Sequence, residues 1–172
     1  AGFTPDDVTR LRSSSLLPDF KRVLLGYARV ETLECVINCD ADPFVPRGWR
    51  VENHRKGGSL EWGPAQVPVE LYLSDSQRNG KVIQGYKLRQ ELEGKPVLNA
   101  CVLDWLLAHP DLIPKNWKGK YIHFWGTIYR GSGGSLYVRY LYWGGSGWHW
   151  NYHWLSHDFS DDDPAPVRAS GS

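Results

Sequence analysis

From Gly131 to Asp163 the chain contains no Lys, Glu, Gln, Ala or Thr. The last Lys of the whole sequence is Lys120, and the last Glu is Glu93. A solvated surface normally uses Lys and Glu freely, so their loss from this segment needs a specific cause. Most of the segment is Gly, Ser, Asp, Asn, His and Tyr, with the indole side chains of Trp143, Trp148, Trp150 and Trp154 set among them. The pattern suggests a fixed aromatic frame that carries an interchangeable set of small and polar side chains.

The genetic code offers a cause for this restricted alphabet. An Asn codon that changes only at its adenines can become Ser, Gly, Asp, His, Tyr and several other residues, but never Lys, Glu, Gln, Met or Trp. The Trp codon contains no adenine, so adenine-directed mutation leaves it unchanged. The segment therefore matches Asn codons set among Trp codons after adenine mutagenesis. The simpler alternative is a Gly/Ser-rich β region with aromatic strands, which is common.

Other absences restrict the class of protein. The net charge is +1, which gives no general case for binding nucleic acid or an anionic membrane. No stretch is long and apolar enough for a transmembrane helix, and the N-terminal residues do not resemble a signal peptide. Cys35, Cys39 and Cys101 lack the spacing of a zinc site. Reduced thiols are expected, and a Cys35–Cys39 disulfide is the alternative if the protein works outside a cell.

Residues 1–66 are irregular and form an N-terminal segment that precedes or packs on the main domain. A helix is expected to start near Thr4, a strand near residues 23–25 followed by a short helix, and a long connection over 40–64.

The main domain is expected over residues 67–172. Alternating apolar residues predict a strand over 67–74, and helical spacing predicts helices over 87–93 and 98–109, the second ended by Pro110. Antiparallel strands are expected over 121–129, 136–143, 148–154 and 167–169, joined by Gly-rich turns. With the helices grouped on one side of the sheet, this is an α+β domain.

The sequence Trp148 to Trp154, WHWNYHW, has a period of two. Trp148, Trp150 and Trp154 are expected to face the helices and to be mostly buried. His149, Asn151 and His153 are expected to face solvent.

The motifs FWGTIYR (124–130), LYVRYLYW (136–143), WHWNYHWLSHDF (148–159) and DPAPVRAS (163–170) resemble the variable protein of a diversity-generating retroelement. The likeness is nearest to versions from archaeal viruses and small uncultivated microbes. It covers about residues 67–170. It implies a C-type-lectin-like fold whose C-terminal region, about 124–170, is rewritten at adenines by a reverse transcriptase. It also implies ligand attachment at a virion or host-cell surface.

On this interpretation the protein is a non-enzymatic display protein. Its partner would be a protein or cell-surface receptor, with no cofactor, no nucleic acid and no insertion into a membrane. Small and polar residues make an adaptable binding surface of low entropy cost. The candidate binding residues are Gly131, Ser132, Ser135, Gly144, Gly145, Ser146, His149, Asn151, His153, His157, Ser160 and Asp161, with Tyr137, Tyr140 and Tyr142 as alternative anchors.

The residues also suggest four alternatives. Exposed Trp rings would suit a carbohydrate-binding module, although the calcium-binding Glu-Pro-Asn motif of sugar-binding C-type lectins is absent. The acidic residues Asp158 and Asp161 to Asp163 would suit calcium, but such a run is usually a solvated loop. His149 and His153 stand roughly 13 Å apart on a strand, too far for one zinc ion. An enzyme has the least support, because no nucleophile–base motif is visible.

Overall fold

The computed structural model describes residues 21–22, 25–27, 35–63 and 69–168. The chain divides into two units, Ala1–Glu34 and Cys35–Ser172. In the first unit, the Leu25 N–H donates to the Lys21 carbonyl oxygen, which closes a single turn. The helix expected near Thr4 and most of the strand expected at 23–25 lie outside the described residues.

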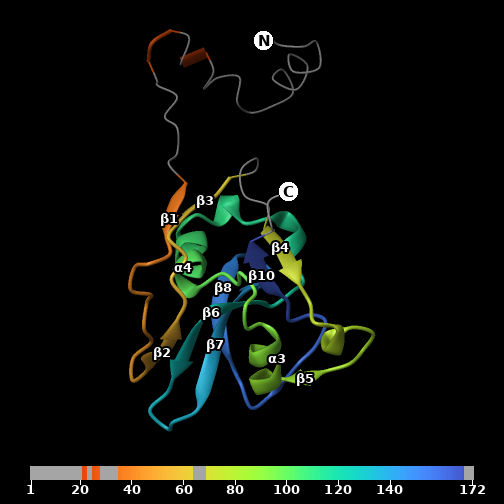
Figure 1. The fold of residues 1–172 in the computed structure, drawn as a ribbon. Coiled ribbons are helices and arrows are strands. Elements are labelled where there is room, and N and C mark those ends of the chain that lie inside the picture. Colours follow the sequence, from red (N-terminus) through yellow and green to blue (C-terminus); the bar gives the residue numbers. More distant parts are fainter. Residues whose placement is uncertain (1–20, 23–24, 28–34, 64–68, 169–172) are drawn as a thin grey trace. The chain divides into compact units, whose positions relative to one another are not determined.

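A four-stranded antiparallel sheet dominates the second unit. Its strand order is β2 (Arg50–His54), β6 (Ile122–Arg130), β7 (Leu136–Trp143) and β8 (Trp148–Trp154). Figure 1 shows β6, β7 and β8 side by side in the centre of this unit. From Ile122 to Tyr129, β6 is buried throughout because it has a strand on each side and packing on both faces.

Smaller two-stranded sheets surround the large one. They pair β1 (Val36–Asn38) with β3 (Ser59–Glu61), β4 (Val69–Tyr72) with β10 (Ala165–Arg168), and β5 (Ile83–Gln84) with β9 (Asp158–Phe159). The helices are α3 (Gly85–Glu91) and α4 (Ala100–Ala108), with short 3-10 turns at Asp75–Gln77, Pro110–Leu112 and Lys115–Trp117.

Helix α4 has clear boundaries in the sequence. The Asn99 side chain accepts a hydrogen bond from the Cys101 N–H and so caps the first turn. Pro110 follows directly after the last turn and cannot continue the α-helical hydrogen bonding. Between these ends, Val102, Leu103 and Leu106 are fully buried.

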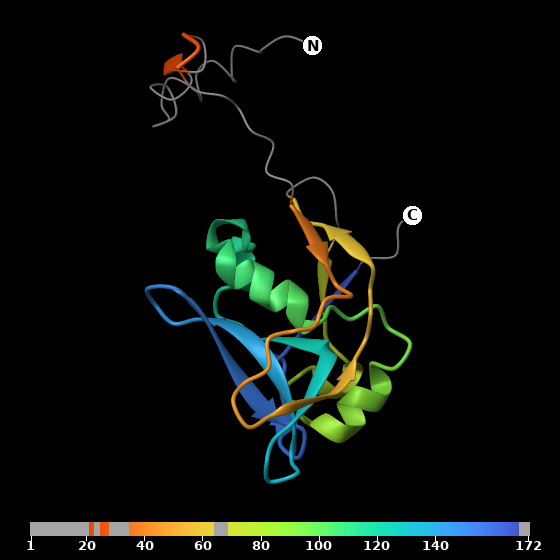
Figure 2. The same cartoon turned by 90° about the vertical axis from the view of Figure 1, so that its left-hand side faces the viewer.

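The two helices pack against opposite faces of the large sheet. Leu141 of β7 belongs to one core cluster with Leu103 and Leu106 of α4. Val138 of β7 belongs to a second cluster with Leu88 of α3. Because side chains 138 and 141 point to opposite faces of the strand, α4 and α3 lie on opposite sides (Figure 2). The expectation that both helices share one side is therefore wrong.

The α+β class is confirmed, and so are the two helices and the strands expected at 67–74, 121–129, 136–143 and 148–154, within the described residues. The last expected strand forms as β10, but it pairs with β4 and does not close the large sheet. The long connection expected over 40–64 is wrong, because it contains β2 and β3, and β2 pairs with β6. The compact unit accordingly starts at Cys35, before the expected boundary at 66/67. No helix within the described ranges is long and apolar enough to cross a membrane.

Candidate ligand-binding face

The register of the β7–β8 hairpin decides which side chains share a face. Tyr142 pairs with His149, and Tyr140 pairs with Asn151. Residues paired directly across two strands point to the same side. His149 and Asn151 are exposed, and the two tyrosines are half-buried beside them.

Tyr121 extends this surface at the start of β6. Its ring lies 5.5 Å from the Tyr140 ring and 6.3 Å from the Tyr142 ring. The Tyr142 ring lies 5.8 Å from both the Tyr140 ring and the His149 ring. Tyr121 is 45% exposed, so the row is open to solvent. We call this surface the open face and define it as Tyr121, Tyr140, Tyr142, His149, Asn151 and His153.

A buried histidine lies beneath the open face. The His123 ring is 4.8 Å from the Tyr140 ring and 6.0 Å from the His153 ring. Its Nδ1–H donates to the Tyr121 carbonyl oxygen at 2.7 Å, while Nε2 has no partner among the described residues. Burial, and to a lesser degree the neighbouring His153, lower the pKa of His123 to about 3. His123 is therefore a neutral part of the core beneath the open face.

His153 is half-buried instead of mostly exposed. Its ring lies 4.7 Å from Phe159, and its Nε2 is 3.3 Å from the Asp158 carbonyl oxygen. Strand β9, which follows the hairpin, covers this end of the open face. Alternation along β8 predicted the correct face for His153, but it could not show that β9 returns beside it.

Two turns border the open face. Gly144, Gly145 and Ser146 are exposed in the β7–β8 turn, where Gly145 has φ +88°. A side chain at Gly144 would come within 2.7 Å of the His149 ring, so a glycine there leaves room for the imidazole.

The second border is the turn over 160–163, which contains the exposed Asp161. The Tyr121 N–H donates to the Asp162 carbonyl oxygen, which fixes this turn beside Tyr121. The Asp163 carboxylate accepts bonds from the Ser160 N–H and Oγ–H, so the Ser160 hydroxyl is committed to the turn. Burial raises the pKa of Asp163, although these bonds oppose the shift.

Four candidate residues lie away from the open face. Ser132 and Ser135 are exposed in the β6–β7 turn, at the opposite end of the sheet from Ser146 and roughly 20 Å away, since β8 has seven residues between these ends. Gly131 is buried, and a side chain there would come within 2.8 Å of the Tyr137 ring. His157 is exposed and stacks on Trp154 at 5.1 Å. The structure thus brings together only part of the expected set.

The Trp residues of β8 lie on the face opposite the open face. The Trp150 ring packs over the Arg139 guanidinium at 4.2 Å and near Phe44 at 5.8 Å. Trp148 and Trp150 pack against the α4 core cluster but are only partly buried, as is Trp154. They are mostly buried, as expected, but not fully, because β8 is the edge strand and has a neighbouring strand on one side only. Tyr137 also lies on this face, where it stacks on Trp49 at 4.4 Å.

One buried cluster has the residue types of a thiol catalyst. The Cys101 Sγ lies 4.0 Å from His54 Nε2, and the Asn99 amide lies 3.5 Å from the same nitrogen. The other His54 nitrogen, Nδ1, is 2.8 Å from Thr127 Oγ1. Burial raises the pKa of Cys101 to about 11, so the thiol is protonated at neutral pH and is a poor nucleophile. Cys35, Cys39 and Cys101 are all free thiols.

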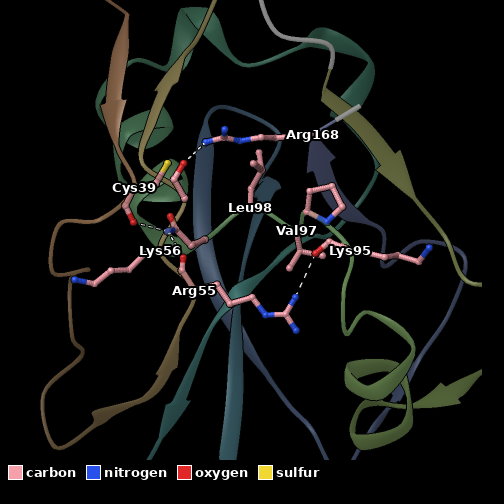
Figure 3. Close-up of a pocket in the computed structure, with 10 residues that line it drawn as sticks. Cys39, Arg55, Lys56, Lys95, Val97, Leu98 and Arg168 are labelled. Atoms are coloured by element: carbon pink, nitrogen blue, oxygen red, sulfur yellow. Dashed lines mark hydrogen bonds between the residues drawn. The ribbon is translucent and has the colours of Figure 1, made fainter. Parts of the chain in front are cut away.

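A pocket of about 270 Å³ lies between the chain after β2 and the loop before α4, and its lining includes Arg55, Lys56, Lys95 and Arg168. Figure 3 shows the Lys56 and Lys95 side chains extending in opposite directions, away from a common centre. Arg55 donates to the Leu92 and Lys95 carbonyl oxygens, and Arg168 donates to the Gly57 carbonyl oxygen. The two arginines therefore join chain segments, and the four cations do not converge on one anion.

Within the described part of the chain, no group of three or more His, Cys, Asp or Glu side chains is arranged to hold a metal ion. No protein-family profile, curated protein or solved structure matches this chain.

Tyr121 is the member of the open face that sequence reasoning missed. It stands just before β6, and its contact with Tyr140 depends on how β6 pairs with β7 across an irregular register. Tyr140 and Tyr142 could have been assigned to the face of Asn151 and His149 from the sequence, since a turn at 144–147 places Trp143 opposite Trp148.

Proposed function

We propose that this protein is a non-enzymatic display protein that binds a macromolecular ligand through the open face and its two bordering turns. The scaffold would be C-type-lectin-like, and adenine-directed mutagenesis would diversify the exposed residues. The ligand would be a protein or a receptor on a cell surface.

The observation that carries this proposal is the division of β8 between its two faces. Residues that adenine mutation can produce, His149, Asn151 and His153, lie on the open face. Residues with adenine-free codons, Trp148, Trp150 and Trp154, lie on the opposite face, where Trp148 and Trp150 pack against the α4 core. Mutation at adenines would therefore change the open face and leave the three Trp side chains unchanged, while Tyr152, whose codon contains an adenine, is the one β8 residue of the opposite face that it could alter.

The chemistry of the open face suits protein recognition. Tyrosine supplies a large contact area at a low cost in side-chain entropy, and Asn, Ser and His supply adaptable hydrogen bonds. Neighbouring rings hold Tyr121, Tyr140 and Tyr142 in place before any ligand arrives. The face itself contains no Lys, Arg, Asp or Glu, which agrees with a ligand that is not a nucleic acid.

A carbohydrate-binding module is the second candidate, because Trp143, Trp148 and Trp154 are partly exposed. Sugar stacking needs a flat ring face free to meet the ligand. The Lys118 ammonium lies 3.5 Å over the Trp143 ring, and the His157 ring is stacked on Trp154. Trp148 meets Trp143 edge to face at 5.5 Å. These contacts compete with sugar stacking and favour the first candidate.

The neighbouring DNA tests the proposed origin of the diversity. A near-copy of the 3′ coding end should lie close by, next to a reverse transcriptase gene. The two copies should differ only where the near-copy has adenines, and these positions should include the codons of His149 and Asn151. If a complete neighbourhood contains no such copy, the retroelement part of the proposal is wrong.

Display libraries test the binding surface directly. One library randomises Tyr142, Ser146, His149 and Asn151, and a matched library randomises Ser132, Ser135 and His157 at the far end of the sheet. After selection against one immobilised test protein, binders should come from the open-face library, with the parent fold retained. Equal yields from both libraries, or a glycan array that binds the parent chain through Trp143, would contradict the proposed site.

A further inference from the structure

Strand β8 is one edge of the large sheet. Among the described residues it pairs with β7 alone. In Figure 2 the β7–β8 hairpin projects sideways from the body of the second unit, with β8 outermost. An edge strand presents unpaired N–H and C=O groups that can hydrogen-bond to another strand.

The two edges of this sheet differ in how they are protected. Strand β2, at the other edge, carries Arg50 and Glu52 and has an irregular register between Val51 and Asn53. Charged residues and bulges are common devices that block pairing at an edge. Strand β8 pairs with β7 without a break and contains no Lys, Arg, Asp, Glu or Pro. It is a regular edge with none of these protections.

Hydrogen bonds at the two ends of the hairpin show which β8 groups point outward. The Leu155 N–H donates to the Leu136 carbonyl oxygen, and the Gly144 N–H donates to the Gly147 carbonyl oxygen. Along an antiparallel strand, the N–H and C=O groups of successive residues point alternately toward the partner strand and away from it. Between these two ends, the N–H and C=O groups of the odd-numbered β8 residues therefore point toward β7. The even-numbered residues of β8 therefore point outward. In agreement, the Tyr152 N–H donates a hydrogen bond to the Asn151 side-chain oxygen and not to β7.

The sequence of β8 is nearly the same in both directions. WHWNYHW is symmetric about Asn151 except that Trp150 corresponds to Tyr152. If a second copy paired antiparallel about a two-fold axis at Asn151, residue 148 would face 154, 149 would face 153, and 150 would face 152. Each aromatic residue would meet an aromatic residue, each histidine a histidine, and Asn151 its own copy.

We propose that β8 pairs antiparallel with β8 of a second copy of this chain, centred on Asn151, to form one continuous sheet across two molecules. The outward backbone groups of residues 148, 150, 152 and 154 then bond to their counterparts. The Asn151 side chain, which caps the Tyr152 N–H in the single chain, is released on pairing. Cross-strand aromatic pairs stabilise such a sheet.

Two features of the structure agree with this partner. Trp148, Trp150, Tyr152 and Trp154 form an aromatic row that is only partly buried, and pairing would place the same row of a second chain beside it. Phe44, which is 53% exposed, packs beside Trp150 and adds apolar surface to that side. The pairing uses the strand edge, so the open faces of both copies remain accessible. Two linked faces bind a multivalent ligand more tightly than one.

Single cysteines test the register. In a Cys35→Ser background, Asn151→Cys would place two thiols on the two-fold axis at a non-hydrogen-bonded pair, where the α-carbons are about 4.5 Å apart. That separation suits a disulfide. His149→Cys alone would place its two copies roughly 13 Å apart, because residue 149 faces residue 153. Under mild oxidation, Asn151→Cys should form a covalent dimer and His149→Cys should not, while the double variant His149→Cys, His153→Cys should.

Sedimentation of a proline variant and a matched alanine variant tests whether two chains associate through the edge of β8. The parent chain should have the mass of two chains at tens of micromolar. Tyr152→Pro removes an outward N–H that makes no bond to β7, and Tyr152→Ala removes the same ring but keeps the N–H. The proline variant should be monomeric, and the alanine variant should remain dimeric with weaker association. Melting curves identify any variant that has not folded. If the proline variant does not fold, the cysteine variants decide whether β8 pairs with β8 of a second copy.

A monomeric parent chain, or disulfide formation at His149→Cys as fast as at Asn151→Cys, would overturn the proposal. Neither result would affect the proposed binding face, since the display libraries test that face in a single chain.

Discussion

The Arg139 guanidinium donates to the Asp104 carboxylate at 2.8 Å and joins β7 to α4. The Arg139 side chain is only 1% exposed and is enclosed by the rings of Phe44 and Trp150. A charge buried to this degree needs a partner, because an uncompensated buried charge is strongly destabilising. The Asp104 carboxylate also accepts the Phe44 N–H, so it positions the loop that covers Arg139.

Replacing Asp104 should therefore lower the free energy of unfolding. Asp104→Asn keeps the shape of the side chain but leaves the Arg139 charge without its counter-ion, and we expect a loss of roughly 2–3 kcal/mol, below the full cost for a buried pair because Asp104 is partly exposed. Asp111→Asn, at an exposed carboxylate, is the matched control and should change stability by less than about 0.5 kcal/mol. Denaturant melts measure both. Equal effects would mean that the ion pair contributes nothing specific.

The two faces of β8 should tolerate substitution differently. Trp150→Ala removes a ring packed on Arg139 and the α4 core cluster, and should cost about 3 kcal/mol. His149→Ser and Asn151→Ser, on the open face, should each stay within about 0.5 kcal/mol. Thermal or denaturant melts of the three variants decide this. Large losses at all three positions would show that β8 is not divided into a packed face and an open face that tolerates substitution.

Stability should fall below pH 6.5 because of His123. Its pKa in the folded chain is lowered to about 3 from 6.5, so in this range the unfolded chain binds a proton that the folded chain does not. The contribution is therefore complete above pH 6.5 and is lost as the pH falls toward 3, at roughly 1.4 kcal/mol per pH unit. Asp163, whose pKa is raised by burial, acts in the opposite direction but at the lower pH where carboxyl groups titrate.

His123→Phe should flatten this dependence between pH 6.5 and 5, because it removes the titrating group. His149→Phe, on the exposed part of β8, is the control and should keep the slope of the parent chain. Chemical denaturation at a series of pH values measures how the free energy of unfolding depends on pH in each variant. An unchanged slope in His123→Phe would assign the acid sensitivity to another group.

Calcium should not change folding. The Asp163 carboxylate is already engaged by the Ser160 backbone and hydroxyl, and Asp161 and Asp162 are exposed. Calcium needs six to eight oxygen ligands in a shaped site. Melting curves with millimolar calcium and with a chelator should superimpose. A clear rise of the melting temperature with calcium would indicate that calcium binds selectively to the folded state. That result would favour a sugar-binding function.

The sequence by itself determined the two helices and the strands β4, β6, β7 and β8. Helix α4 follows from the cap at Asn99, the apolar spacing and Pro110, all of which act within a few residues. The alternation of WHWNYHW assigned His149 and Asn151 to the face opposite Trp148 and Trp150, because the side-chain period of a strand is fixed by its backbone. The restricted alphabet also marked the hairpin that carries the open face.

Only the tertiary structure decided what depends on distant segments. Residues 50–54 are mostly polar, and their pattern did not predict a strand. They nevertheless pair with β6, because an apolar central strand needs a neighbouring strand on each side. The Tyr137 ring buries Gly131, and the return of β9 half-buries His153. The edge position of β8 leaves its Trp residues partly exposed. Burial is set by what packs against a residue, and for these residues the packing partners come from other segments of the chain.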